Sequence, residues 1–193
     1  MSDFKTNRIF RPGSEISLNA CVGENGGPYD SLDYAKGYFS AALVIVDSAR
    51  ELRIPTDLAV YPVVFSFRHG IELALKYFVQ SLPRAADDTP RLKCTHNLTD
   101  NWEVVRASVL GLEPLDPVST IPTLDGIIRD VVDFDPTGQV FRFPSDRSGN
   151  LHLQEARIIN LGVLQEEIEA SREIFDFWEF QRDRLHQAEL EGH

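Results

Sequence analysis

Residues 65–78, with the sequence FSFRHGIELALKYF, constrain the fold more than any other part of the chain. At about 100° per residue on a helix, Arg68, His69, Glu72 and Lys76 fall within one third of the circumference, and apolar side chains fill the rest. This pattern predicts a helix that is buried on most sides and carries one charged stripe. The stripe is either the solvated face of a core helix or a functional site, and composition alone does not decide between them.

The length and the cysteine content limit the class of protein. A chain of 193 residues is typical of one domain that buries roughly 70% of its unfolded surface. Cys21 and Cys94 lie far apart without a CxxC pair, so we expect reduced thiols and neither a metal site nor a cofactor. No apolar run has the length of a signal peptide or reaches the ~18 residues of a membrane span. We therefore expect a soluble, cytoplasmic protein with no membrane partner.

The charge of the chain is strongly acidic but uneven. Its net charge of −11 comes from 30 acidic and 19 basic residues, which excludes the generally basic surface of a nonspecific nucleic-acid binder. Residues 68–96 nevertheless hold five bases and three acids, so a locally basic pocket on an acidic body is compatible with the sequence. The fifteen arginines suit planar contacts to phosphates or carboxylates, and salt bridges within so acidic a chain are their commoner use.

Periodicity and capping residues predict the first half of the chain as an arm followed by two helices. Residues 1–29 lack a sustained period and predict an N-terminal arm. Asp30 or Ser31 caps a first helix that continues to about Leu52. A second helix runs from about Asp57 to Leu82, with Pro62 in an early turn.

The second half of the chain predicts two shorter helices, an irregular region and a long last helix. Thr95 is the expected cap of the third helix, and a short fourth helix begins near Thr120. Residues 135–160 predict an irregular excursion or a small hairpin, followed by a last helix that begins at Asn160 and frays after Leu185.

The fold class that follows is all-α, a bundle of four to five helices. We expect a single bundle domain over residues 30–188 and a frayed tail over residues 189–193. The chain contains no GxGxxG, GxxxxGK[ST], HExxH or GxSxG motif, so the mechanisms that these motifs signal are not indicated.

Glu72 and Lys76 form an i, i+4 pair, which on an exposed helix is worth only about 0.3–0.5 kcal/mol. Here the pair lies in a helix whose other faces are apolar, and a buried charge is tolerated only when it is paired or hydrogen-bonded. We therefore expect His96, at the start of the third helix, to turn its imidazole toward Glu72 or His69.

Three short motifs occur in a fixed order: ELALK at 72–76, THNL at 95–98 and RFP at 142–144. Together with the long last helix they resemble the HEPN domain, the nucleotide-binding helical domain of higher eukaryotes and prokaryotes, over about residues 57–182. The resemblance implies an HEPN-like bundle, commonly a homodimer, that binds a nucleotide, RNA or a cognate partner protein in a prokaryotic defence or toxin–antitoxin setting. The ligand-binding residues would then be those of the charged stripe and of the RFP motif: Arg68, His69, Glu72, Lys76 and Arg142.

Some HEPN domains are metal-independent ribonucleases that carry an Arg, four to six intervening residues and a His. Arg91 with His96 fits this spacing, as does Arg147 with His152, whereas about one match is expected by chance. Both pairs depart from the pattern, because Arg91 follows Pro90 in an expected loop and Arg147 lies in an expected turn. If the protein is an enzyme, the resemblance implies an endoribonuclease that uses Arg91 and His96.

Two further alternatives stay open. The acidic last helix is compatible with a non-catalytic protein-interaction subunit. In the RFP motif, either Phe141 and Phe143 anchor the loop while Arg142 bridges to Glu72 or another acid, or Arg142 binds a phosphate. The structural interpretation is favoured, since aromatic residues that flank an arginine in a connection usually serve as anchors.

Overall fold

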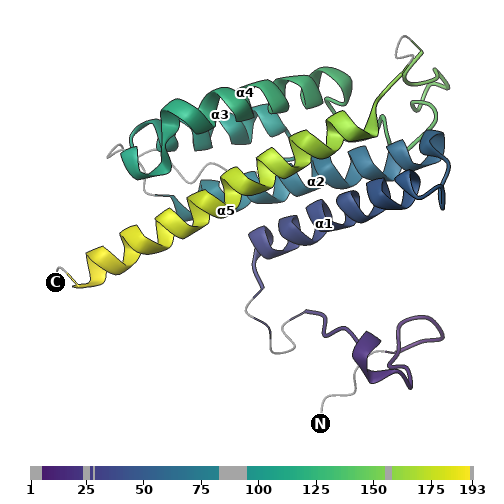
Figure 1. The fold of residues 1–193 in the computed structure, drawn as a ribbon, viewed down its shortest axis with the longest axis horizontal. Helices are drawn as coiled ribbons and strands as arrows, with labels where there is room; N and C mark the ends of the chain where they lie inside the picture. Colours follow the sequence, from purple (N-terminus) through teal and green to yellow (C-terminus); the bar gives the residue numbers. More distant parts are fainter. Residues whose placement is uncertain (1–5, 24–26, 28, 83–94, 155–157, 192–193) are drawn as a thin grey trace.

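A computed structural model describes residues 6–23, 27, 29–82, 95–154 and 158–191 (Figure 1). These residues form five α-helices and contain no strand, which confirms the predicted all-α class. The helices are α1 (Ser31–Arg50), α2 (Thr56–Ser81), α3 (Leu98–Leu110), α4 (Pro117–Phe134) and α5 (Leu161–Glu191).

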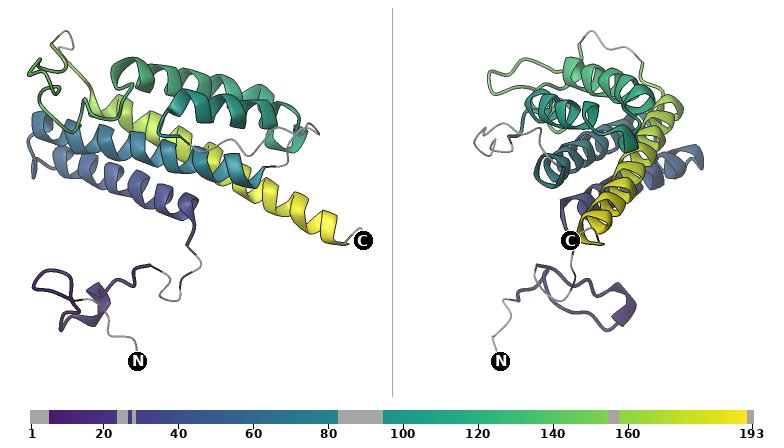
Figure 2. Two further views of the ribbon diagram at one scale, coloured as in Figure 1. Left: turned by 180° about the vertical axis from the view of Figure 1, so that it is seen from behind. Right: turned by 90° about the vertical axis from the view of Figure 1, so that its left-hand side faces the viewer.

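The helices form two antiparallel hairpins with the last helix laid across them. α1 pairs with α2 and α3 with α4, while α5 runs obliquely over both pairs (Figure 1), and α2 contacts α1, α3 and α5 (Figure 2). Trp178 joins α5 to the other half, because its indole Nε1 donates to the Leu115 carbonyl (2.9 Å) and its ring stacks near Trp102 (6.4 Å between centroids).

The helix ends agree only in part with the predictions. Asp30, one of the two expected caps, begins α1 and forms a capping box with Asp33. α3 is capped by Asn97 and not by Thr95, because the Asn97 carboxamide accepts from the Thr99 amide (2.9 Å). α4 begins at Pro117, earlier than expected, since proline is pre-organised for the first position of a helix.

The last helix continues to Glu191, past Leu185 where the sequence predicts fraying. Its final turns extend beyond the other helices (Figure 1).

α2 is the central helix of the core. By length and composition alone it is apolar enough to span a membrane, but most of its side chains are buried against the neighbouring helices. Burial in the bundle accounts for its apolar sequence, because a helix that is hydrophobic nearly all round is typical of a protein core. The charged stripe therefore lies in the most buried element of the fold.

The loop between α4 and α5 is irregular, with a single antiparallel bridge between Ser145 and Leu151. Asp146 closes the turn inside the bridge by accepting from the Ser148 and Asn150 amides. The expected hairpin is thus reduced to one bridge within the part of the loop that the structure describes.

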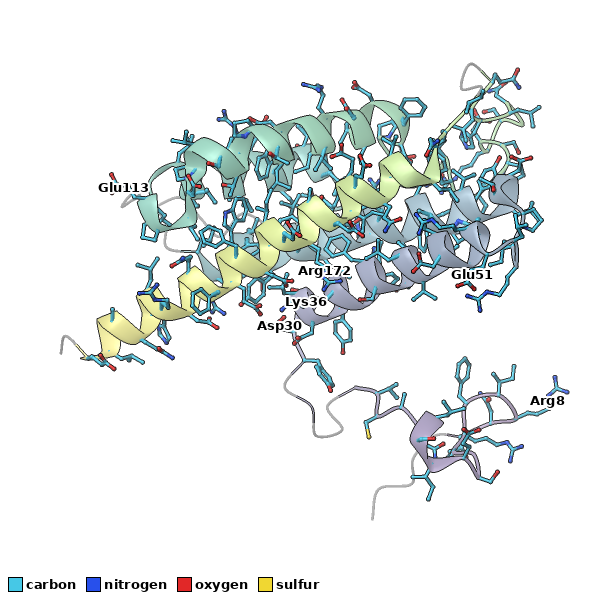
Figure 3. The ribbon with its side chains drawn as sticks, viewed as in Figure 1. Arg8, Asp30, Lys36, Glu51, Glu113 and Arg172 are labelled. Carbon is cyan, nitrogen blue, oxygen red and sulfur yellow. The ribbon has the colours of Figure 1, made fainter. Side chains whose placement is uncertain are left out.

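The N-terminal arm lies apart from the helices, as Arg8 illustrates in Figure 3. Its described residues contain one turn of 3-10 helix, Ile16–Leu18, and the large apolar side chains among them are exposed.

Candidate functional site

Arg68 is buried, and its guanidinium is used by the protein itself. Its Nε donates to the Asp135 backbone carbonyl (3.1 Å), and its Nη1 donates to Glu72 Oε2 (3.3 Å). Gly138 lies directly against it with φ +75°, and a Cβ at that position would come within 2.6 Å of Nη1. Arg68 thus joins α2 to the loop that follows α4 and is not presented to a ligand.

Glu72 is the hub of the charged stripe. Its buried carboxylate accepts from Lys76 Nζ (2.7 Å) and from His96 Nδ1 (2.8 Å) at Oε1, and from Arg68 at Oε2. Burial alone would raise the pKa of Glu72, but the hydrogen bonds from Lys76 and His96 outweigh it and hold the pKa below its ordinary value. The side chain is therefore an ionised carboxylate that organises three basic groups.

His96 is the exposed end of this cluster. Its side chain is 91% exposed, whereas that of Glu72 is 6% exposed, so the imidazole lies on the surface and is anchored from below. Because an ionised carboxylate only accepts, Nδ1 carries a proton, and Nε2 faces solvent. The predicted contact between His96 and Glu72 is confirmed.

The THNL motif fixes the backbone that carries His96. The buried Asn101 carboxamide accepts from the Thr95 amide (3.2 Å) and donates to the Thr95 carbonyl (2.9 Å). Asn97 caps α3 on the other side of His96, and Leu98 is buried. The imidazole is therefore held by a clamped backbone as well as by the Glu72 carboxylate.

His69 and Arg142 share one aromatic ring instead of joining the Glu72 hydrogen bonds. The His69 ring lies parallel to Phe65 (6.0 Å between centroids) and edge-on to Tyr38 (4.5 Å). The Arg142 guanidinium lies over Phe65 (5.5 Å) and over Phe143 (5.4 Å). Partial burial is the main cause that lowers the pKa of His69, and the charges of Lys76, Arg68 and Arg142 act in the same direction against that of Glu72.

The favoured structural interpretation of the RFP motif is correct for Phe141 and wrong for the other two residues. Phe141 is 4% exposed and anchors the loop, but Phe143 is 49% exposed. Arg142 makes no ion pair with Glu72 or with any other carboxylate of the described residues. Its guanidinium lies between aromatic rings at the surface.

Of the first Arg/His pair with ribonuclease spacing, Arg91 and His96, the structure describes only His96. Arg91 lies outside the described residues, so its distance from His96 stays untested. Arg147 and His152 both lie in the bridged loop, and the described structure has no hydrogen bond or ion pair between their side chains.

A groove of about 630 Å³ lies between α2, α4 and the first turns of α5, away from the charged stripe. The described part of its lining is mostly apolar and includes none of the predicted site residues that the structure describes. Among the residues that the structure describes, no three His, Cys, Asp or Glu side chains converge as a metal site. Among the predicted site residues, ionisable side chains meet near the surface at Glu72, Lys76 and His96.

Three residues that hold the site were not predicted from the sequence: Asp135, Gly138 and Asn101. The sequence DPTG at 135–138 signals a turn, but a backbone carbonyl as the partner of Arg68 leaves no signal in residue types. Asn101 was detectable as a polar residue one turn into an apolar helix stripe.

Comparison of the chain with protein-family models, with curated proteins and with solved structures finds no match in any of the three.

Proposed function

We propose that the chain is an HEPN-like helical module, a homodimer in a prokaryotic defence or toxin–antitoxin setting, that binds RNA or a nucleotide at the surface formed by Lys76 and His96. The observation that carries this proposal is the exposed His96 imidazole held by the buried Glu72 carboxylate at 2.8 Å. The residues of that contact belong to the ELALK and THNL motifs, on which the resemblance rests.

The geometry suits a phosphate-bearing ligand. Lys76 Nζ and the His96 imidazole approach the same oxygen of Glu72, so an ammonium and an imidazole lie side by side. Lys76 Nζ donates hydrogen bonds to phosphate oxygens in ordinary recognition sites, and so does imidazole Nε2 when it carries a proton. Orientation of both groups by one carboxylate reduces the entropy that binding would otherwise cost.

Calorimetric titration with ATP, GTP and a short RNA tests the proposal. Lys76→Gln is expected to weaken binding of at least one of these ligands about tenfold or more, which corresponds to loss of one charge-assisted contact. Lys36→Gln is the matched control, because Lys36 also pairs with an acid, Glu179 at 2.6 Å, but lies between α1 and α5 (Figure 3). Absence of binding to all three ligands by the folded wild type would refute the proposal and favour a protein-interaction subunit.

The exposed Nε2 of His96 also favours a second candidate function, metal-independent cleavage of RNA. Nε2 would take the proton from a ribose 2′-OH, the 2′ oxygen would attack phosphorus, and the P–O5′ bond would break as the 5′ oxygen takes a proton from solvent. The products are a 2′,3′-cyclic phosphate and a 5′-OH, and Glu72 would stabilise the imidazolium that forms.

Cleavage of labelled RNA in the presence of a chelator tests this candidate. His96→Ala is expected to abolish cleavage, and His152→Ala, the other histidine with the ribonuclease spacing, is expected to leave it unchanged. Full activity of His96→Ala would remove the assignment.

A further inference from the structure

Arg142 differs from most surface arginines of this acidic protein. Arg50, Arg53 and Arg106 each contact a neighbouring carboxylate at 2.7 to 3.2 Å. Arg142 is exposed, contacts no carboxylate of the described residues, and is held over the rings of Phe65 and Phe143. Its position is fixed while its five N–H donors stay available, which is the condition under which arginine binds phosphate well.

The aromatic ring under Arg142 connects it to the proposed binding surface. Phe65 contacts both Arg142 and His69, and it lies on the partly exposed side of α2 that also carries Lys76. Phe65 and Lys76 are eleven positions apart, which at about 1.5 Å per residue is roughly 16 Å along the helix. A mononucleotide does not bridge that length, whereas a short oligonucleotide does.

We propose that a single-stranded RNA lies along α2, with one nucleotide at Lys76 and His96, a phosphate farther along the strand on Arg142, and a base stacked on the exposed ring of Phe143. This inference rests on the proposed function and specifies its ligand as an RNA strand longer than one nucleotide. The ring of Phe143 is about half exposed, and any base can stack on such a ring because every base has a π-face.

The charge of the rest of the protein favours this path. With a net charge of −11, most of the surface repels a polyanion, so a strand is favoured where cations lie in line. Lys76 and Arg142 provide two such cations, and the ring of His69, which contacts Phe65 between them and whose pKa is lowered mainly by partial burial, is suited to stacking.

Fluorescence anisotropy with uncleavable 2′-O-methyl RNA tests the path, using a mononucleotide, a dinucleotide and an octanucleotide on the full chain. The wild type is expected to bind the octanucleotide more tightly than the dinucleotide. Arg142→Ala and Phe143→Ala are each expected to weaken octanucleotide binding about tenfold and to leave mononucleotide binding unchanged. Arg142→Ala is also expected to reduce the slope of log K against log salt by about 0.7.

Arg184→Ala is the matched control, because Arg184 also lies over one aromatic ring, Phe180 at 5.8 Å, but on α5. It is expected to bind all three ligands as the wild type does.

The possible failures are distinguishable. If Lys76→Gln weakens binding of every ligand while Arg142→Ala weakens none, the proposed function stands and the strand path is wrong. Equal weakening of mononucleotide and octanucleotide by Arg142→Ala would also overturn the path, because it would place Arg142 in a single-nucleotide site. If the folded wild type binds no RNA or nucleotide, both proposals fail together.

Discussion

Arg68 and His96 are the two ends of the hydrogen-bond network around Glu72, and they differ in how they are buried. At one end, Arg68 is buried between Glu72 and the Asp135 carbonyl, and Gly138 closes over it. At the other end, His96 donates to the same Glu72 carboxylate, and its side chain is 91% exposed. One end of the network therefore joins elements of the core, and the other lies at the surface, where we propose that a ligand binds.

The comparison shows that a buried charge and an exposed one can share a single counter-ion. Glu72 is fixed by Arg68 from within the core, and this fixed carboxylate then orients His96 at the surface. The buried contact between Arg68 and Glu72 therefore gives the exposed His96 a defined orientation. Such support of a surface group by a rigid buried one is common in binding sites.

Arg68→Ala is expected to reduce stability more than any other substitution below, because it removes the buried contacts of Arg68 with Glu72 and Asp135. The free energy of unfolding should fall by about 3 kcal/mol, since the variant breaks a buried ion pair and leaves the Asp135 carbonyl without its donor. Urea denaturation followed by circular dichroism measures the change. Arg53→Ala, which removes an exposed arginine from its pair with Glu51, should change stability by less than about 1 kcal/mol.

Gly138→Ala tests the closure over Arg68 and should cost about 2 kcal/mol, within the range for overpacking a filled site. The added Cβ would meet Nη1 at 2.6 Å, and the guanidinium is held by its hydrogen bonds. Gly149→Ala is the matched control, because Gly149 has a similarly positive φ of +88° and no neighbour within 4 Å of the added atom. Equal thermal destabilisation of the two variants would show that only backbone strain matters.

Asn101→Ala tests the clamp beneath His96 and should reduce stability by about 1–2 kcal/mol, because two hydrogen bonds to Thr95 are lost at a buried position. Its effect on ligand binding or RNA cleavage should exceed that of Asn97→Ser, which keeps a capping side chain at the neighbouring position. Unchanged function in Asn101→Ala would mean that Glu72 alone positions His96.

The pH dependence of stability separates two further groups of the stripe. The pKa of His69 is lowered in the fold, so its contribution is present above its ordinary value of 6.5 and is lost as pH falls through the folded value. The pKa of Glu72 is also lowered, so its contribution is lost only in more acidic solution, below its ordinary value of 4.5. Denaturation at a series of pH values should show a decline below about pH 6.5 that is absent in His69→Gln.

His96→Ala should give the smallest change in stability, less than about 0.5 kcal/mol, because the side chain is exposed and Glu72 keeps its bonds to Arg68 and Lys76. Ligand binding or cleavage should nevertheless be lost. A destabilisation as large as that of Arg68→Ala would contradict the division between the two ends, since it would make His96 part of the core network.

The sequence predicted those parts of the fold and site that depend on local spacing. Helix periodicity placed α1 and α2 within a few residues, and the need of a buried carboxylate for partners predicted the contact between Glu72 and His96. Residue types did not predict Asp135 as the partner of Arg68, because its hydrogen bond is made by a backbone carbonyl 67 positions away and its carboxylate lies farther off, at 3.8 Å.

Arg142 shows a different limit of prediction. An acidic chain offers many counter-ions, so an ion pair was the expected partner, but the loop path places Arg142 over two rings and leaves it without a carboxylate among the described residues. Which surface group an arginine meets depends on the course of an irregular loop, and that course is set by tertiary contacts such as those of Phe141.

The 67 positions between Arg68 and Asp135 also correspond to a delay during protein synthesis. At a synthesis rate of about 5–20 residues per second, roughly 3 to 13 seconds pass between the appearance of Arg68 and that of its partner carbonyl. During this interval α2 exists without the loop that covers the Arg68 guanidinium. A nascent chain that stalls before Asp135 therefore exposes the segment that most resembles a membrane span, and only continued synthesis converts α2 into the centre of a folded bundle.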